Sequence, residues 1–326
     1  MMEENRAEQL LFLWEKISEG EIRLLRVFGE QPVVTVPEFI DGRCVRELGD
    51  YCFSRRKLPE NEIRYSRYCG GMWESGLFVL KDKEKKDRIS SEQEENIISL
   101  ETIERDGKLH ELSEKYIKEV QLPADIVKIG SCAFYNCTQM ERISVYPKLV
   151  EVGSDAFMNC LNLRSLRMCA RVEEPTGLKQ LLAQIKWQVE VSFEHEDGVG
   201  EAVLLYPEYY ESYDEIGPAH IFELNLTGEG FRARQCFKDG VILLNAYDEI
   251  FPQACVEESA EVLIPMAWNR LYAACGLSAE ARAAYEEYVR EQSGKVLTIL
   301  LKKRELKPLH FFFEKGYGRK EQIEET

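Results

Sequence analysis

The chain has 326 residues, 44% of them hydrophobic, and a formal net charge of −16 at pH 7. This length usually means two domains unless part of the chain is a solenoid, and the composition supports a packed core. The acidic surplus disfavours nucleic acid and anionic membrane surfaces as partners, and no apolar run is long enough for a transmembrane helix.

The first residues lack the charged start and apolar run of a secretory signal peptide, so we expect a cytoplasmic protein. Further on, two apolar segments, residues 10–16 and 21–28, flank a turn at residues 18–20. This pattern favours a β-hairpin that caps the element that follows, and a helix over residues 4–17 is the alternative.

Two internal repeats follow each other at an offset of 23 residues, so that Gly130 corresponds to Gly153 and Val120 to Ile143. An earlier and looser copy lies at residues 33–56, where Val34 corresponds to Val120. Agreement at so many positions indicates a solenoid, because one coil cannot bury its apolar side and must stack on the next.

Between the early copy and the close copies lies an insertion at about residues 57–116. Its stretch from residue 81 to residue 95 is rich in charge and poor in apolar side chains. Such a composition is typical of a segment that does not fold by itself, and we predict a flexible excursion between two neighbouring coils.

The repeat motif, an apolar strand ending in Pro followed by I-G-x-x-A-F-x-x-C, resembles the BspA-like, or treponemal-type, leucine-rich repeat family. The resemblance covers mainly residues 33–56 and 117–168. It implies a bacterial origin, a parallel β solenoid and a binding role. Many members of the family carry export signals, which this chain lacks, so the resemblance leaves a surface or adhesin-like role as an alternative.

Repeat positions predict the interior of the solenoid. The repeated phenylalanines should form a buried aromatic stack, and the repeated glycines should lie at corners where a Cβ would clash. The repeated asparagines should bond to the backbone of the turns, and the repeated cysteines should fill the core. These residues are Phe53, Phe134, Phe157, Gly130, Gly153, Asn136, Asn159, Cys137 and Cys160.

After the solenoid, the pattern changes to a small α+β unit and then to helices. We expect a helix at 178–185 and strands at 187–193, 202–206, 219–226 and 231–237. Helices are expected from residue 259 onward, with Ser278 as an N-cap and Gly316 ending the last one. The predicted fold class is therefore α+β, with regions at residues 1–170, 171–258 and 259–326.

The sequence contains no catalytic motif, and it predicts no metal site and no cofactor site. Residues 194–197 contain a histidine between acidic residues, but a solvated turn explains them better. A nucleophile set of Cys236, His220 and Asp214 would require a fold that brings three distant residues together.

One compositional anomaly indicates a contact surface, because tyrosines offer large rigid area with a polar tip. Residues 206–215 form a loop-like, acidic segment with four tyrosines, among them Tyr209, Tyr210 and Tyr213. Arg232 and Arg234 alternate in the predicted strand that follows and would frame the surface. Packing of the tyrosines onto neighbouring strands is the alternative.

The sequence therefore favours a non-enzymatic scaffold that binds a protein partner, without specifying that partner or an oligomeric state. An enzyme with its site in residues 178–256 is the first alternative, and a surface or secreted repeat protein is the second.

Ten cysteines within apolar patterns are expected to be free thiols, as in a reducing compartment. Thiol titration of the denatured, unreduced protein should therefore find all ten reactive. A lower count would reveal a disulfide and favour the surface protein.

Overall fold

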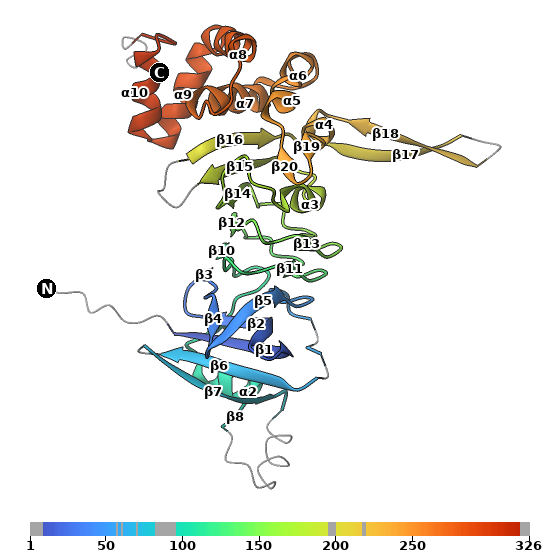
Figure 1. Ribbon diagram of the computed structural model, residues 1–326, viewed down its shortest axis with the longest axis vertical. Helices are drawn as coiled ribbons and strands as arrows, with labels where there is room; N and C mark the ends of the chain where they lie inside the picture. The colour runs from blue at the N-terminus through green and yellow to red at the C-terminus, as the bar shows by residue number, and fades with distance from the viewer. Residues whose placement is uncertain are drawn as a thin grey trace, which may run out of the picture. The chain divides into compact units, whose positions relative to one another are not determined.

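The computed structural model describes residues 9–56, 58–59, 61–69, 71–81, 96–194, 200–216 and 220–319 (Figure 1). The chain forms two compact units, Met1–Leu166 and Arg167–Thr326. The second unit contains both the predicted α+β region, 171–258, and the predicted helical region, 259–326.

The first unit begins with the predicted hairpin, and the alternative helix is wrong. Strands β1 (Leu10–Ser18) and β2 (Glu21–Gly29) pair in antiparallel fashion. Strand β2 also pairs in parallel with β5 (Arg43–Leu48), which belongs to the first coil and carries the short partner β4 (Phe39–Ile40). The hairpin thus covers the open edge of the first coil, as a cap must.

The insertion folds, so the prediction of a flexible excursion over residues 57–116 is wrong for most of it. Strand β6 (Ile63–Cys69) pairs with β1, and β7 (Met72–Val79) and β8 (Ile97–Ser99) extend the same sheet. Helix α2 (Leu100–Asp106) and strand β9 (His110–Glu111), which pairs with β2, complete the insertion. The charged residues 82–95 lie outside the described residues.

Apolar side chains of the insertion explain why it folds. They pack with the hairpin in one buried cluster of the first unit: Leu11, Leu13, Leu25, Phe28, Leu58, Ile63, Tyr65, Phe78, Ile98, Ile103 and Leu109. The burial of this many apolar side chains offsets the loss of conformational entropy on ordering the segment.

The predicted repeat register is confirmed by the strand pairs of the coils. Strand β10 (Glu119–Gln121) lies between β3 (Val33–Thr35) and β12 (Arg142–Val145), all parallel, and Val120 pairs with both Val34 and Ile143. On a second side of the coils, β11 (Lys128–Ile129) lies between β5 and β13 (Glu151–Val152). The coils at 33–56 and 117–160 are therefore neighbours despite the insertion.

The predicted aromatic stack is also confirmed. Phe53, Phe134 and Phe157 are fully buried, and their ring centroids are 4.8 Å and 5.2 Å apart with nearly parallel planes. Cys137 and Cys160 are buried as predicted, and each thiol donates to the carbonyl of a phenylalanine one coil earlier, at 3.1 Å and 3.0 Å. The thiols thus join adjacent coils as well as filling space.

The coil corners need the glycines, but the asparagines act differently from the prediction. A Cβ on Gly130 would lie 2.5 Å from the backbone nitrogen of Asp50, so no larger residue fits. Asn136 and Asn159 have φ of 61° and 66°, a region that asparagine tolerates. Their side chains bond to each other between coils, Nδ2 to Oδ1 at 2.7 Å, because identical residues of successive coils face one another.

The second unit begins with neighbouring strands of one sheet and a short helix. Strands β14 (Ser165–Met168), β15 (Val189–Glu194) and β16 (Gly200–Tyr206) follow in that order, and α3 (Leu178–Ala183) lies between the first two in sequence. Strands β17 (Tyr210–Ile216) and β18 (Ile221–Thr227) form a separate hairpin, and β19 (Phe237–Lys238) and β20 (Val241–Ile242) form another.

Six helices complete the described part of the second unit. They are α5 (Leu244–Asp248), α6 (Phe251–Glu257), α7 (Ala260–Tyr272), α8 (Ala279–Glu291), α9 (Ser293–Lys303) and α10 (Leu306–Glu314). Helix α7 packs against β16. Ser278 caps α8 as predicted, its hydroxyl accepting from the backbone nitrogen of Ala281 at 3.1 Å, and Gly316 follows α10 with φ of 69°.

Two further properties of the described chain concern its thiols and its helices. All ten cysteines are free. Among the described residues, no helix has both the length and the apolar character needed to cross a membrane.

The stacked phenylalanines lead to a stability prediction. Phe134→Ala should lower the free energy of unfolding by about 3–5 kcal/mol, because it removes the middle ring and leaves a cavity. Urea unfolding followed by circular dichroism would measure this. Met158→Ala is the control, since this side chain is 47% exposed in the next coil, and we expect a change within about 0.5 kcal/mol. A small effect of Phe134→Ala would contradict the stack.

Candidate functional site

Hairpin β17–β18 starts from a base that a buried guanidinium organises. Arg234 is 3% exposed, and all four of its hydrogen bonds that the structure shows end on backbone carbonyls. They reach Ile185 and Trp187 at 3.0 Å, Pro207 at 2.6 Å and Gly230 at 2.8 Å. One side chain therefore joins the segment before β15, the turn between β16 and β17, and the turn that follows β18.

Two tyrosines of the predicted segment form the walls around this guanidinium. The Arg234 Cζ lies 5.0 Å from the ring centroid of Tyr209 and 5.8 Å from that of Tyr206. Burial lowers the pKa of Arg234 to about 10, which still leaves it charged at neutral pH. Burial also raises the pKa of both tyrosines, so their hydroxyls stay protonated there.

The predicted strand over residues 231–237 is wrong, and so is the role of its two arginines on one polar face. Residues Gly230–Ala233 form the short helix α4. Arg234 follows this helix and is buried, whereas the side chain of Arg232 is 61% exposed and pairs with Glu229 at 3.4 Å. Gly230 permits the turn, because a Cβ there would lie 2.1 Å from the carbonyl oxygen of Pro207.

The segment predicted as loop-like is a strand, and the register of the hairpin separates its side chains into two faces. Cross-strand partners point to the same face, so Tyr213 shares a face with Leu224, its direct partner. Phe222 and Leu226 lie on that same face, together with their direct cross-strand partners Glu215 and Glu211. We call Tyr213, Phe222, Leu224 and Leu226 the apolar face.

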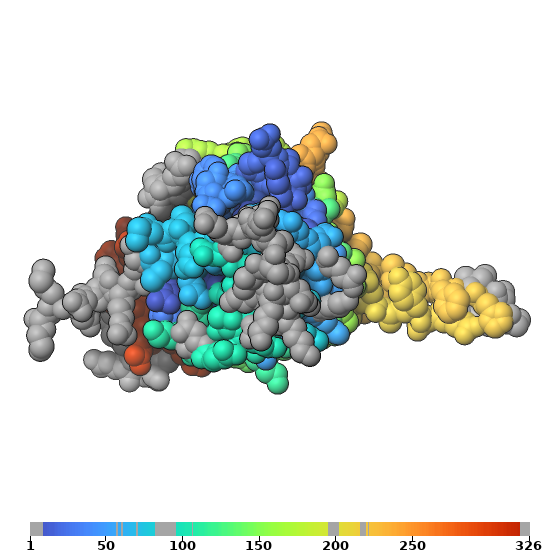
Figure 2. Space-filling view, turned by 90° about the horizontal axis from the view of Figure 1, so that it is seen from below, coloured from blue at the N-terminus to red at the C-terminus, as the bar shows by residue number. Residues whose placement is uncertain are grey.

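All four side chains of the apolar face are exposed, Tyr213 and Phe222 by 66% and 63%. The hairpin extends away from the rest of its unit (Figures 1 and 2, yellow). Within the described part of the chain its sheet has two strands, so each strand keeps an edge with no strand paired to it. Two strands with an uncovered apolar face are marginal in water and gain stability from a third element.

The three tyrosines predicted to form one contact surface therefore lie in three different environments. Tyr209 is 6% exposed and belongs to the base, next to Phe231 at 5.7 Å. Tyr210 is 63% exposed on the polar face, where its hydroxyl donates to Glu208 at 2.6 Å. Only Tyr213 lies on the apolar face. Sequence reasoning missed Phe222, Leu224 and Leu226, although the alternation of apolar and polar residues from 222 to 226 is a signal for such a face.

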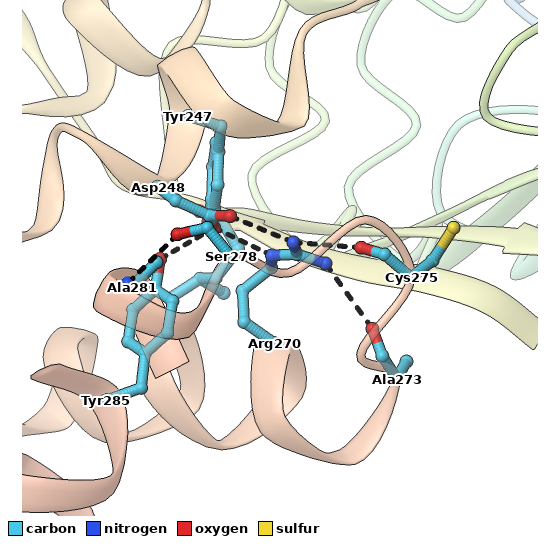
Figure 3. Close-up of polar contacts among 9 residues, drawn as sticks. Tyr247, Asp248, Arg270, Ala273, Cys275, Ser278, Ala281 and Tyr285 are labelled. Carbon is cyan, nitrogen blue, oxygen red and sulfur yellow. Dashed lines mark hydrogen bonds and ion pairs between the residues drawn. The ribbon is translucent and has the colours of Figure 1, made fainter. Parts of the chain in front are cut away.

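A pocket of about 460 Å³ lies in the same unit, beside α5, α6 and the start of α8. It tests the alternative of an enzyme, because its lining includes Asp248 and Tyr285 (Figure 3). Asp248 accepts two hydrogen bonds from the fully buried Arg270, at 2.8 Å and 2.9 Å, and one from the Tyr285 hydroxyl at 2.9 Å.

This cluster holds helices together. Arg270 also donates to the carbonyl of Cys275 at 3.0 Å, which ties the loop after α7 to α5. Burial, with the nearby Asp248 charge, raises the pKa of Tyr285 far above its usual range, so its hydroxyl stays protonated. The carboxylate is occupied and the phenol is not a base, which is the pattern of a structural ion pair.

The remaining chemical candidates are not brought together. His220 bonds to Glu215, Asp214 accepts from Asn225 at 2.8 Å, and burial raises the pKa of Cys236 to about 11. Residues 195–197 of the considered metal turn lie outside the described residues. Within the described part, no group of three or more His, Cys, Asp or Glu could hold a metal ion.

Comparison with known proteins identifies one segment. Residues 96–176 match a family model described as BspA type leucine rich repeat region (6 copies). The match spans about a quarter of the chain and includes the coils at 117–168. Strand pairing adds the coil at 33–56 to the same stack. No curated protein and no solved structure matches the chain.

The base of the hairpin predicts a strong effect of its arginine. Arg234→Ala would leave several buried carbonyls without donors and should lower the free energy of unfolding by at least about 3 kcal/mol. Thermal and urea unfolding would measure the loss. Arg232→Ala, two residues earlier, is the matched control and should change stability by less than about 0.5 kcal/mol. Equal effects of the two variants would show that Arg234 does not hold the base.

A second prediction concerns the buried carboxyl group of Glu229, which is 1% exposed. Burial raises its pKa, and Glu257 and Glu258 add to the shift despite the opposing charge of Arg232. A raised carboxyl pKa stabilises the fold below the ordinary pKa, and this contribution is lost as pH rises through the raised value. Glu229→Gln should therefore raise Tm at pH 7 to 8 and have little effect at pH 4. A lower Tm at neutral pH would contradict this.

Proposed function

We propose, from the premise that the chain carries a BspA-type leucine-rich repeat region, that it is a non-enzymatic scaffold that binds another protein through the apolar face of hairpin β17–β18. Repeat regions of this kind serve protein interaction in general, and solenoids present extended surfaces. The observation that carries the proposal is an exposed apolar face on a two-stranded sheet that the other described residues of its unit leave uncovered.

The occupant we propose is a segment of a partner protein that lies across the four apolar side chains. Such a segment would supply the third element that a two-stranded hairpin lacks, either as a strand at an open edge or as a helix on the face. Aromatic residues on a rigid support are typical centres of binding energy, and Tyr213 and Phe222 provide two of them.

The state of Asp248 and Tyr285 supports a non-enzymatic role over the alternative of an enzyme. The pocket they line offers a carboxylate already engaged by Arg270 and a phenol whose pKa is too high for a base. The proposal also places the protein in the cytoplasm, in contrast to surface members of the family. Ten free thiols agree with a reducing compartment.

Photo-crosslinking from defined hairpin positions tests the proposal. A benzophenone amino acid is introduced at Tyr213 or Leu224 on the apolar face, or at Ser212 on the opposite face, and irradiated in a lysate of the source cells. We expect one and the same protein, identified by mass spectrometry, to be crosslinked from the first two positions and not from the third. Phe222→Ser with Leu226→Ser should abolish both adducts.

The outcomes separate the alternatives. Equal adducts from both faces, or none from the apolar face, would overturn the proposed surface. Adducts formed only with a second copy of this chain would replace the proposed partner by self-association. As a folding control, Tyr213→Ser should leave Tm within a few degrees of the parent, whereas Tyr209→Ser should lower it clearly, because only Tyr209 is buried.

A further inference from the structure

The hairpin that carries the apolar face is also strongly acidic. Residues 206–228 contain five carboxylates and neither lysine nor arginine: Glu208, Glu211, Asp214, Glu215 and Glu223. Glu215 pairs with Phe222 and Glu211 pairs with Leu226, so these two carboxylates lie on the apolar face itself, whereas Asp214 and Glu223 pair with each other in the neighbouring row, on the other face. A partner that covers the apolar face therefore enters a field of negative charge.

Local cations compensate only part of this charge. Glu211 pairs with Lys186 at 2.6 Å, and Glu208 and Asp214 accept from the neutral groups of Tyr210 and Asn225. Neutral donors satisfy a carboxylate oxygen without removing its charge. The end of the hairpin away from the base, with Asp214, Glu215 and Glu223, has His220 as its sole titratable base among the described residues.

This charge decides between possible occupants of the apolar face. A second copy would bring five further carboxylates against the first five, and the whole chain carries −16, so self-association is opposed by repulsion. Anionic lipid or nucleic acid is opposed for the same reason. A segment with apolar side chains on one side and lysine or arginine beside them would be attracted instead.

We propose that the partner segment is a basic amphipathic peptide stretch of another protein, whose apolar side covers Tyr213, Phe222 and Leu224 and whose cations meet Glu215 on the same face, within the negative field that Asp214 and Glu223 add from the other face. This rests on the proposed function and adds the chemistry of the partner to it. Apolar burial supplies the affinity, whereas the carboxylates select basic partners and speed their encounter.

Selection from an unbiased peptide library tests the inference with the full chain. Random displayed peptides are selected on the parent protein and counter-selected on the Phe222→Ser, Leu224→Ser variant, which lacks the apolar face. We expect the surviving peptides to be enriched in lysine and arginine, relative to the input library, beside apolar residues. Their affinity should also fall as salt concentration rises.

A charge-neutral variant then measures the electrostatic part. Asp214→Asn, Glu215→Gln and Glu223→Gln together should weaken a selected basic peptide by about tenfold or more. The matched control removes three carboxylates from exposed positions of other elements, with Glu261→Gln, Glu280→Gln and Glu287→Gln, and should leave affinity within about twofold. Thermal unfolding verifies that both variants remain folded.

The results distinguish this inference from the proposed function. Peptides that depend on the apolar face but show no basic enrichment, or that bind the charge-neutral variant as well as the parent, would overturn the inference and leave the proposed function standing. A selection without any face-dependent peptide would overturn the inference too, and the crosslinking pattern would then decide the proposed function by itself.

Discussion

A coil of a solenoid cannot bury its own apolar side, and this constraint organises the whole first unit. Each coil relies on main-chain pairing and on the phenylalanine stack of its neighbours, so an uncovered end would expose both. The β1–β2 hairpin covers the end of the solenoid, because β2 pairs with β5 of the first coil. The insertion then extends the hairpin sheet through β6 to β8, and its apolar side chains complete one core instead of starting another.

In the second unit, a comparable organising role falls to Arg234. A guanidinium that is bonded to carbonyl oxygens and stacked between two tyrosines is an unusual way to stabilise a buried charge. It fixes the points where the hairpin leaves and rejoins the unit, so the hairpin can extend without packing along its length. A rigid base combined with uncovered faces suits a contact surface better than a site that must exclude water.

The sequence specified local and periodic features well, and it failed where tertiary packing decides. The offset of Gly130 and Gly153 predicted register, corners and the aromatic stack, because repetition amplifies a weak local signal. The charged run after residue 81 led to the prediction that the whole insertion is flexible. Its apolar residues, such as Ile63 and Phe78, pack against the hairpin sheet, and this contact is not visible in the local sequence. Arg234 resembled a residue on the polar face of a strand, since nothing local indicates four carbonyls from distant segments. The apolar face could not be predicted from the tyrosines of β17, because three of its four side chains come from β18 and only the pairing of the two strands places them beside Tyr213.

The insertion also sets an order of events during folding. Val34 and Val120 are direct neighbours in the solenoid although the whole insertion separates them along the chain. Closing so long a loop is entropically costly, whereas Val120 and Ile143 can meet across one short coil. The coils from residue 117 onward can thus pair early, and the first coil joins them once the inserted strands have folded onto β1. On the ribosome, the earliest coil to be synthesised would be among the last to be stacked.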